Sequence, residues 1–64
     1  MITDDTAELS SMATVIAELS QRIDTVADRY VDSPREDVAA RLFEVERALR
    51  QAERILGQLV RDAT

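Results

Sequence analysis

Two stripes of apolar residues lie on either side of a single Ser-Pro break, and both have the spacing of a coiled-coil helix. In each stripe, apolar side chains recur at alternating steps of three and four residues. Such alternation is typical of a helix that buries a narrow seam against another helix. The pattern therefore predicts an all-α fold, an antiparallel, coiled-coil-like hairpin of two helices. The first stripe consists of Leu9, Met12, Ile16, Leu19, Ile23, Val26 and Tyr30, and the second of Val38, Leu42, Val45, Leu49, Ala52, Leu56 and Leu59.

The break between the stripes has the sequence of a helix start. Ser33 stands at the N-cap, Pro34 at the first helical position and Glu36 at the third, which is the arrangement of a capping box. Proline also disfavours the helical conformation of Ser33, so the first helix should end there. One continuous, kinked helix is the alternative, but a separate cap and a matching second stripe favour two helices. We expect a single domain over residues 1–64, with helices over about 4–31 and 34–61 and a turn at 32–33.

The two stripes also predict a register. Antiparallel helices pair the a positions of one heptad pattern with the d positions of the other. The a positions here are Leu9, Ile16, Ile23, Tyr30, Leu42, Leu49 and Leu56, and the other stripe residues occupy d positions. This rule places Leu9 opposite Leu59 and Tyr30 opposite Val38, and it centres the hairpin on Pro34. The stripes therefore pair along their whole length around the Ser-Pro break.

A hairpin of this size shares only one seam and barely offsets its conformational entropy. Small residues beside the first stripe have no evident use in a lone hairpin, but they permit close approach of another helix. Phe43 lies outside the second stripe, where it serves either this contact or, alternatively, docking of a different protein. We therefore expect two hairpins to pair into a dimeric four-helix bundle, with their first helices central. The predicted dimer interface consists of Ser10, Ala13, Ala17, Ser20, Ala27 and Phe43.

The composition of the chain excludes several classes of function. The formal net charge is −5, which repels nucleic acids and anionic membranes unless a local patch overrides it. The absence of Cys and His excludes disulfides, zinc fingers and imidazole catalysis. No apolar run approaches the ~18 residues of a membrane span, and the acidic N-terminus is unlike a signal peptide. We expect a cytoplasmic protein that does not bind membranes.

One face of the second predicted helix is rich in arginine. The preferred interpretation is a solvated surface with helical salt bridges, because acidic residues stand four positions before several arginines. A contact with a partner protein and a phosphate-binding face are the alternatives. No aromatic residue interleaves with the arginines to stack on bases, which disfavours nucleic acid. The residues of this arginine face are Arg47, Arg50, Arg54 and Arg61.

The sequence contains no recognisable catalytic arrangement. Acid–base catalysis needs paired groups with separated pKa values in a closed cleft, and no nucleophile–base pair is evident. Asp24, Asp28 and Asp32 form an acidic ridge that could receive a basic segment or a divalent ion, but carboxylates on successive turns do not converge as metal ligands. We predict no catalytic, cofactor or metal site. The expected function is a non-catalytic protein–protein interaction module, a small self-associating structural, adaptor or regulatory protein; the alternative is a nucleic-acid-binding regulator that uses the arginine face.

Overall fold

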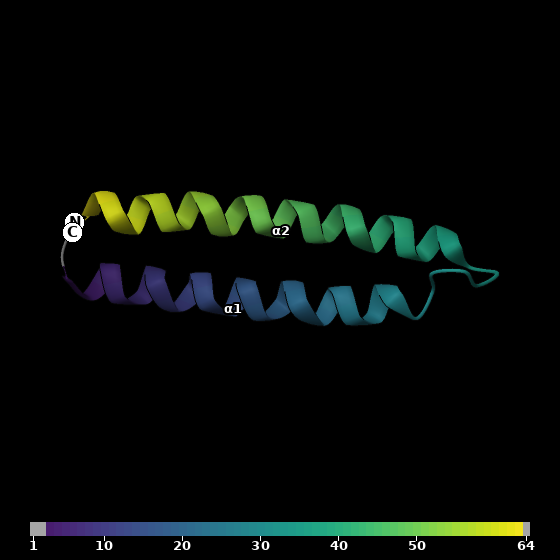
Figure 1. Ribbon diagram of the computed structural model, residues 1–64. Coiled ribbons are helices and arrows are strands. Elements are labelled where there is room, and N and C mark those ends of the chain that lie inside the picture. Colours follow the sequence, from purple (N-terminus) through teal and green to yellow (C-terminus); the bar gives the residue numbers. More distant parts are fainter. Residues whose placement is uncertain (1–2, 64) are drawn as a thin grey trace.

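The computed structural model of the chain describes residues 3–63. It contains two long helices, α1 (Thr3–Asp28) and α2 (Glu36–Ala63), and no strand among those residues. The helices lie antiparallel and side by side, as Figure 1 shows, and the Cα trace is 50 Å long. We call the end with the connecting segment the turn end, and the end where α1 begins and α2 stops the open end. The predicted all-helical hairpin is confirmed.

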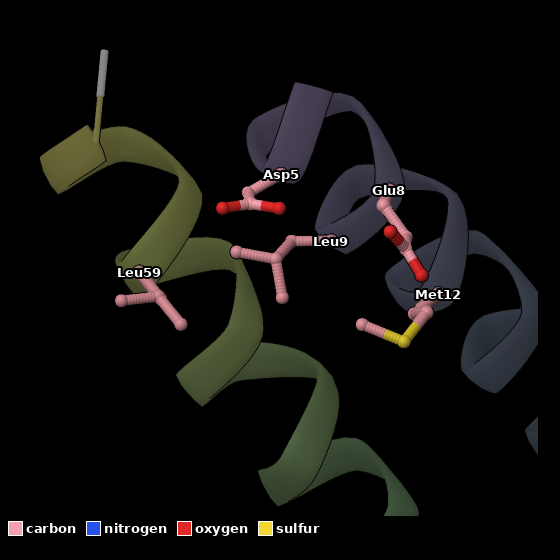
Figure 2. Close-up of a pocket in the computed structure, with 5 residues that line it drawn as sticks. All are labelled: Asp5, Glu8, Leu9, Met12 and Leu59. Carbon is pink, nitrogen blue, oxygen red and sulfur yellow. The ribbon is translucent and has the colours of Figure 1, made fainter. Parts of the chain in front are cut away.

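The two helices meet in the expected register. Near the open end, Leu9 and Leu59 line the same shallow groove, as Figure 2 shows. The same agreement continues toward the turn end, because every groove between the stripes joins residues that the register places opposite each other. The pairs that line a common groove are Leu9 with Leu59, Met12 with Leu56, and Val26 with Leu42.

The centre of the helix contact, however, lies beside the predicted seam. The most buried residues described are Ser20, Ala27 and Ala39, whose exposed fractions are 4%, 0% and 1%. Each occupies the heptad position that follows d. By contrast, Met12 and Leu19 at d positions are 42% and 39% exposed. Val45 and Leu59, which also occupy d positions, are similarly exposed. The prediction that both stripes form a buried seam is therefore wrong for these four d residues.

Side-chain size explains this rotation. Two helices approach closely only where their facing side chains are small, and close approach increases dispersion contacts along the backbone. The small residues of α1 also face long acidic side chains of α2. Glu53 lines a common cavity with Ala17 and Ser20, and the Glu46 side chain is only 13% exposed. The small residues Ala17, Ser20 and Ala27 of α1 therefore contribute to the contact between the two helices of one hairpin.

This placement corrects part of the predicted dimer interface. Ser20 and Ala27 are buried within the hairpin, so they cannot contact a second copy without separating the helices. Small residues do have a use in a lone hairpin, because they, rather than the larger stripe residues, close the helix contact. Of the other predicted interface residues, Ser10 is exposed, and Ala13, Ala17 and Phe43 are half-buried.

The turn is longer than expected. Helix α1 ends at Asp28 rather than near Val31, and α2 begins at Glu36 rather than at Pro34. The amide of Tyr30 donates to the Ala27 carbonyl at 2.9 Å, an i−3 bond that tightens the end of the helix. Asp32 then adopts a positive φ of 61°, a left-handed conformation that reverses the chain and that Asp tolerates better than most residues.

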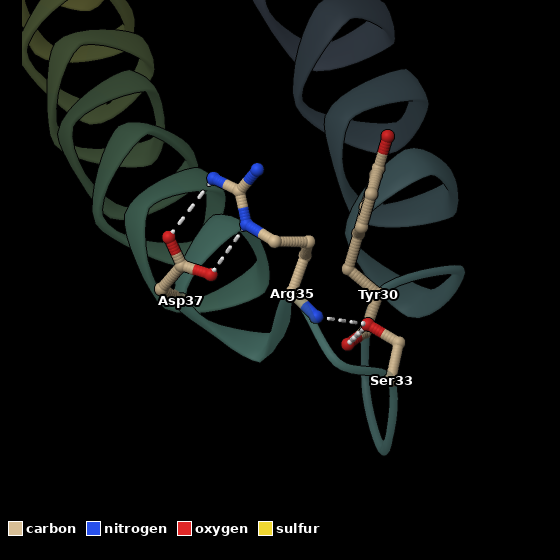
Figure 3. A network of polar contacts seen from close by, with 4 residues as sticks. All are labelled: Tyr30, Ser33, Arg35 and Asp37. Atoms are coloured by element: carbon tan, nitrogen blue, oxygen red, sulfur yellow. Dashed lines mark hydrogen bonds and ion pairs between the residues drawn. The ribbon is translucent and has the colours of Figure 1, made fainter.

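The start of α2 uses the predicted residues in a pattern displaced by one position. The Arg35 amide donates to Ser33 Oγ at 3.1 Å, and the Asp32 amide donates to Glu36 Oε2 at 3.2 Å. A capping box would instead join Ser33 and Glu36 to each other. The Ser33 hydroxyl also donates to the Tyr30 carbonyl at 2.6 Å, as Figure 3 shows, and so ties the cap to the end of α1.

An exposed ion pair follows the cap. The Arg35 guanidinium donates to both carboxylate oxygens of Asp37, at 3.0 and 3.1 Å (Figure 3). This bidentate hydrogen bond, assisted by backbone amides at the helix start, lowers the pKa of Asp37, and the same bond raises the pKa of Arg35. Asp37 also lies in the first turn of α2, where the helix dipole favours negative charge.

The buried alanines provide a test of the close contact. We expect Ala27→Gln to destabilise the fold by about 1–3 kcal/mol, because no space exists for a longer side chain at this position. Ala40→Gln is the matched control: Ala40 is exposed on α2, and the change should stay within about 0.5 kcal/mol. Urea unfolding followed by circular dichroism at one fixed protein concentration measures both. Equal stabilities for the two variants would contradict the contact.

The ion pair at the start of α2 predicts a pH dependence. A lowered carboxyl pKa contributes stability above the pKa of the unfolded chain, and this contribution is lost as pH falls through the folded-state pKa. Arg35→Gln should therefore raise the pKa of Asp37 and reduce stability at neutral pH, but not in strong acid, where Asp37 is protonated in both proteins. NMR titration of the Asp37 carboxyl and unfolding at the two pH values check this. A stability difference that persists unchanged in acid would show that Arg35 acts by another route.

Candidate interaction surface

The two stripes lie toward one side of the hairpin, where stripe residues of both helices line common grooves. Because the position after d closes the helix contact, the two stripes are turned toward this side together. We call these fourteen stripe residues the apolar face. Four of its d residues, Met12, Leu19, Val45 and Leu59, are about two-fifths exposed, and Val15 and Ile55 beside it are 58% and 54% exposed. The predicted seam is therefore a half-open surface.

Shallow grooves run along the apolar face, and charged residues border them differently at the two ends. At the open end, Asp5 and Glu8 stand beside the groove that Leu9 and Leu59 line (Figure 2). Nearer the turn, Arg22 borders the groove between Leu19, Ile23, Val26 and Leu42. The border of the face is therefore acidic at the open end and basic toward the turn.

The hairpin exposes more surface than a compact protein of its mass. Its solvent-accessible area is 4846 Å² for 7.2 kDa, whereas folded monomers of this size expose roughly 4,100 Å². The difference of about 700 Å² agrees with the elongated shape of the hairpin, whose Cα trace is 50 Å long and 14 Å wide. Among the described residues, no large side chain is fully buried. The hairpin thus lacks an interior of its own.

One further cavity between the helices has a mainly polar lining. Ala17, Ser20, Gln21, Arg50 and Glu53 line this shallow cavity. The Ser20 hydroxyl is buried between the two helices. Within residues 3–63 its oxygen has no hydrogen-bond partner. A buried hydroxyl without a partner carries a desolvation penalty. This cavity is therefore lined mainly by polar and charged side chains, unlike the grooves of the apolar face.

The four residues of the arginine face are exposed but do not form a uniform basic stripe. The Arg50 Nη2 donates to Glu46 Oε2 at 3.3 Å, which is an i,i+4 ion pair of the kind expected for a solvated helix surface. The Arg61 guanidinium lies alongside Gly57, one turn earlier. Arg47 and Arg54 are exposed on the outer surface of α2. Acidic side chains thus lie among the arginines.

The acidic ridge is likewise spread along the surface. Asp24 is half-buried, and Asp28 and Asp32 are exposed. In the described part of the chain, no group of three or more acidic side chains could hold a metal ion. Neither helix, within the same residues, has a stretch long and apolar enough to cross a membrane.

Comparison with known proteins adds no relative. No protein family model matches the chain, and no curated protein or solved structure is significantly similar to it.

The unpartnered hydroxyl of Ser20 leads to a stability prediction. We expect Ser20→Ala to stabilise the fold by about 1 kcal/mol, because it removes a buried polar group without a partner. Ser10→Ala is the control: Ser10 is exposed, so that variant reports only the difference in helix propensity, about 0.5 kcal/mol. Urea midpoints of the two variants give the comparison. A Ser20→Ala protein no more stable than Ser10→Ala would show that the hydroxyl is satisfied in solution.

Proposed function

We propose that this protein is a non-catalytic protein–protein interaction module that associates with itself through the apolar face. The carrying observation is the half-open face itself: Met12, Leu19, Val45 and Leu59 are each about two-fifths exposed, while the only fully buried apolar residues described are two alanines. Exposed contiguous apolar surface of this extent marks an interaction site in small proteins. A protein that associates with itself and catalyses no reaction would have a structural, adaptor or regulatory role.

The dimensions of the face support a pairing of two copies. The Cα trace is 50 Å long and 14 Å wide, so the flat side of the hairpin has a projected footprint of about 700 Å², which is of the same order as the ~800 Å² per partner that a standard specific interface buries. Face-to-face packing of two hairpins would complete a four-helix bundle, in which every helix has two neighbours. The a and d side chains would then form the interior that the single hairpin lacks.

Nucleic-acid binding through the arginine face is the alternative. Its support is weaker, because Arg50 is paired with Glu46 and the net charge is −5. Retention on an RNA or DNA matrix that falls steeply with salt, and that Arg47→Gln and Arg54→Gln abolish, would favour this alternative. An interaction module should flow through the matrix at moderate salt.

Self-association predicts that Leu19→Glu dissociates the dimer. A carboxylate in the centre of an apolar interface lacks a partner and loses its hydration, so the dissociation constant should rise by about two orders of magnitude or more. Light scattering coupled to size exclusion measures the mass over a concentration series, and the melting temperature of the parent should rise with concentration. Gln51→Glu is the control, because Gln51 is exposed away from the apolar face. A parent that stays at 7.2 kDa at high micromolar concentration would contradict the proposal.

A further inference from the structure

We infer that two copies join their apolar faces with their turns at opposite ends, so that α1 packs on the partner's α1 and α2 on the partner's α2. This inference rests on the proposed self-association and goes further by specifying the arrangement. We call it the opposed arrangement. In the aligned arrangement both turns lie at the same end, and α1 packs on the partner's α2. Two-fold symmetry permits only these two ways of stacking the hairpins with their helices nearly parallel.

The apolar residues do not distinguish the two arrangements, because a positions can meet d positions in both. The residues that border the apolar face do distinguish them. We call these the rim residues; each stands one position before an a residue, and all eight are exposed. Three of them border the grooves directly: Glu8 at the open end, Val15 in the middle and Arg22 toward the turn. The rim residues are Glu8, Val15, Arg22 and Arg29 beside α1, and Arg41, Ala48, Ile55 and Asp62 on α2.

Charge is divided along this rim by position. The three cationic rim residues, Arg22, Arg29 and Arg41, lie in the half of the hairpin that contains the turn. The two acidic rim residues, Glu8 and Asp62, lie at the open end. The rim residues between these groups are apolar. Each copy thus presents a basic half and an acidic half around one apolar face.

The opposed arrangement brings opposite charges together. When the a and d layers of α1 pair with those of the partner's α1, Glu8 comes opposite the partner's Arg29. The same rule applied to α2 brings Arg41 opposite the partner's Asp62. In the middle, Ile55 meets the partner's Ala48, which extends the apolar contact. Because of the two-fold symmetry each ion pair occurs twice, and opposite charges that flank an apolar seam set the orientation of helices.

The aligned arrangement brings like charges together. There α1 would pair with the partner's α2 in the register of the hairpin itself. Glu8 would then face the partner's Asp62, and Arg29 would face the partner's Arg41. Each of these repulsions would also occur twice. Juxtaposed like charges act against a competing arrangement even where the apolar contacts are equally good.

The single polar d position gives independent support. Asp5 lines the groove at the open end, where an apolar residue would otherwise continue the first stripe. In the opposed arrangement Asp5 comes opposite the partner's Tyr30, the last residue of that stripe. Tyr30 is half-buried and carries a hydroxyl that can donate a hydrogen bond to the carboxylate. The polar d residue Asp5 thus lies opposite Tyr30, the one stripe residue whose side chain can donate a hydrogen bond to it.

Charge reversal tests the arrangement. In the opposed dimer, Glu8→Arg places two cations together, and the dissociation constant should rise about tenfold at low salt and less at high salt. Adding Arg29→Glu should restore the affinity, because the pair is re-formed with its charges exchanged. Glu18→Arg is the matched control: Glu18 is an exposed acid of α1 away from the rim. It reduces the net negative charge equally and should not weaken the dimer. Sedimentation equilibrium measures all four proteins.

A distance measurement checks the same inference without relying on charge. The chain contains no cysteine, so Arg35→Cys allows one spin label per copy at the turn. In the opposed dimer the two labels lie roughly 45 Å apart along the helices, at 1.5 Å per residue. In the aligned dimer they lie within about 25 Å, because neighbouring helices are only 8–10 Å apart.

The outcomes separate the two proposals. A dimer that Glu8→Arg tightens, or whose labels lie close together, overturns the opposed arrangement and leaves self-association standing. A parent chain that stays monomeric overturns both. Weakening by Glu8→Arg, rescue by Arg29→Glu and a long label distance together support the opposed dimer.

Discussion

Two helices share a single line of contact, and this constraint governs the rest of the structure. Each helix carries an arc of apolar and small residues that is wider than one neighbour can cover. The hairpin therefore buries only part of the arc, and Ala27 and Ala39 are the residues that it covers completely. The larger a and d side chains remain at the edge of the contact. The apolar face is thus the part of a wide arc that the hairpin leaves uncovered.

The division follows from side-chain size. Small residues give little area when buried, but they allow two backbones to approach, and dispersion then accumulates along the whole contact. Large residues at the centre of the hairpin would hold the helices apart and leave less room for the stems of Glu46 and Glu53. The same large residues bury far more area when another surface covers them. In the proposed dimer, small residues inside the hairpin and large ones on its face would therefore serve packing on two sides at once.

Much of this fold follows from the sequence, and the part that does not has an identifiable cause. The stripes and the Ser-Pro break predict two helices and their register, because heptad spacing is unambiguous over this length. The rotation of the contact is not predictable from spacing alone. Ala13, Ser20 and Ala27 have the same spacing as Met12, Leu19 and Val26, and hydropathy favours the larger set. Burial shows instead that Ser20 and Ala27 close the hairpin.

In the turn and on the candidate surface, too, the residue types are informative but their exact partners are not predictable from the sequence. Ser33 and Glu36 both cap backbone amides, as their types predict, but each acts one residue away from the expected partner. The displacement arises because Asp32 reverses the chain with a positive φ, which a propensity argument does not anticipate. Likewise, Val15 is not among the site residues predicted from the sequence, although it lines a groove of the apolar face. Its apolar side chain directly before the stripe residue Ile16 is the sequence feature that indicates this position.

Affinity and orientation have different physical sources in the proposed dimer. Apolar burial is non-directional and would stabilise the opposed and the aligned arrangements alike. Exposed ion pairs such as Glu8 with the partner's Arg29 each contribute little to affinity. Their effect on orientation is larger, because exchanging one arrangement for the other replaces every attraction on the rim by a repulsion. A chain of net charge −5 also repels its own copy. Opposed pairing places the cationic half of each rim against the acidic half of the other, which is where that repulsion is most reduced.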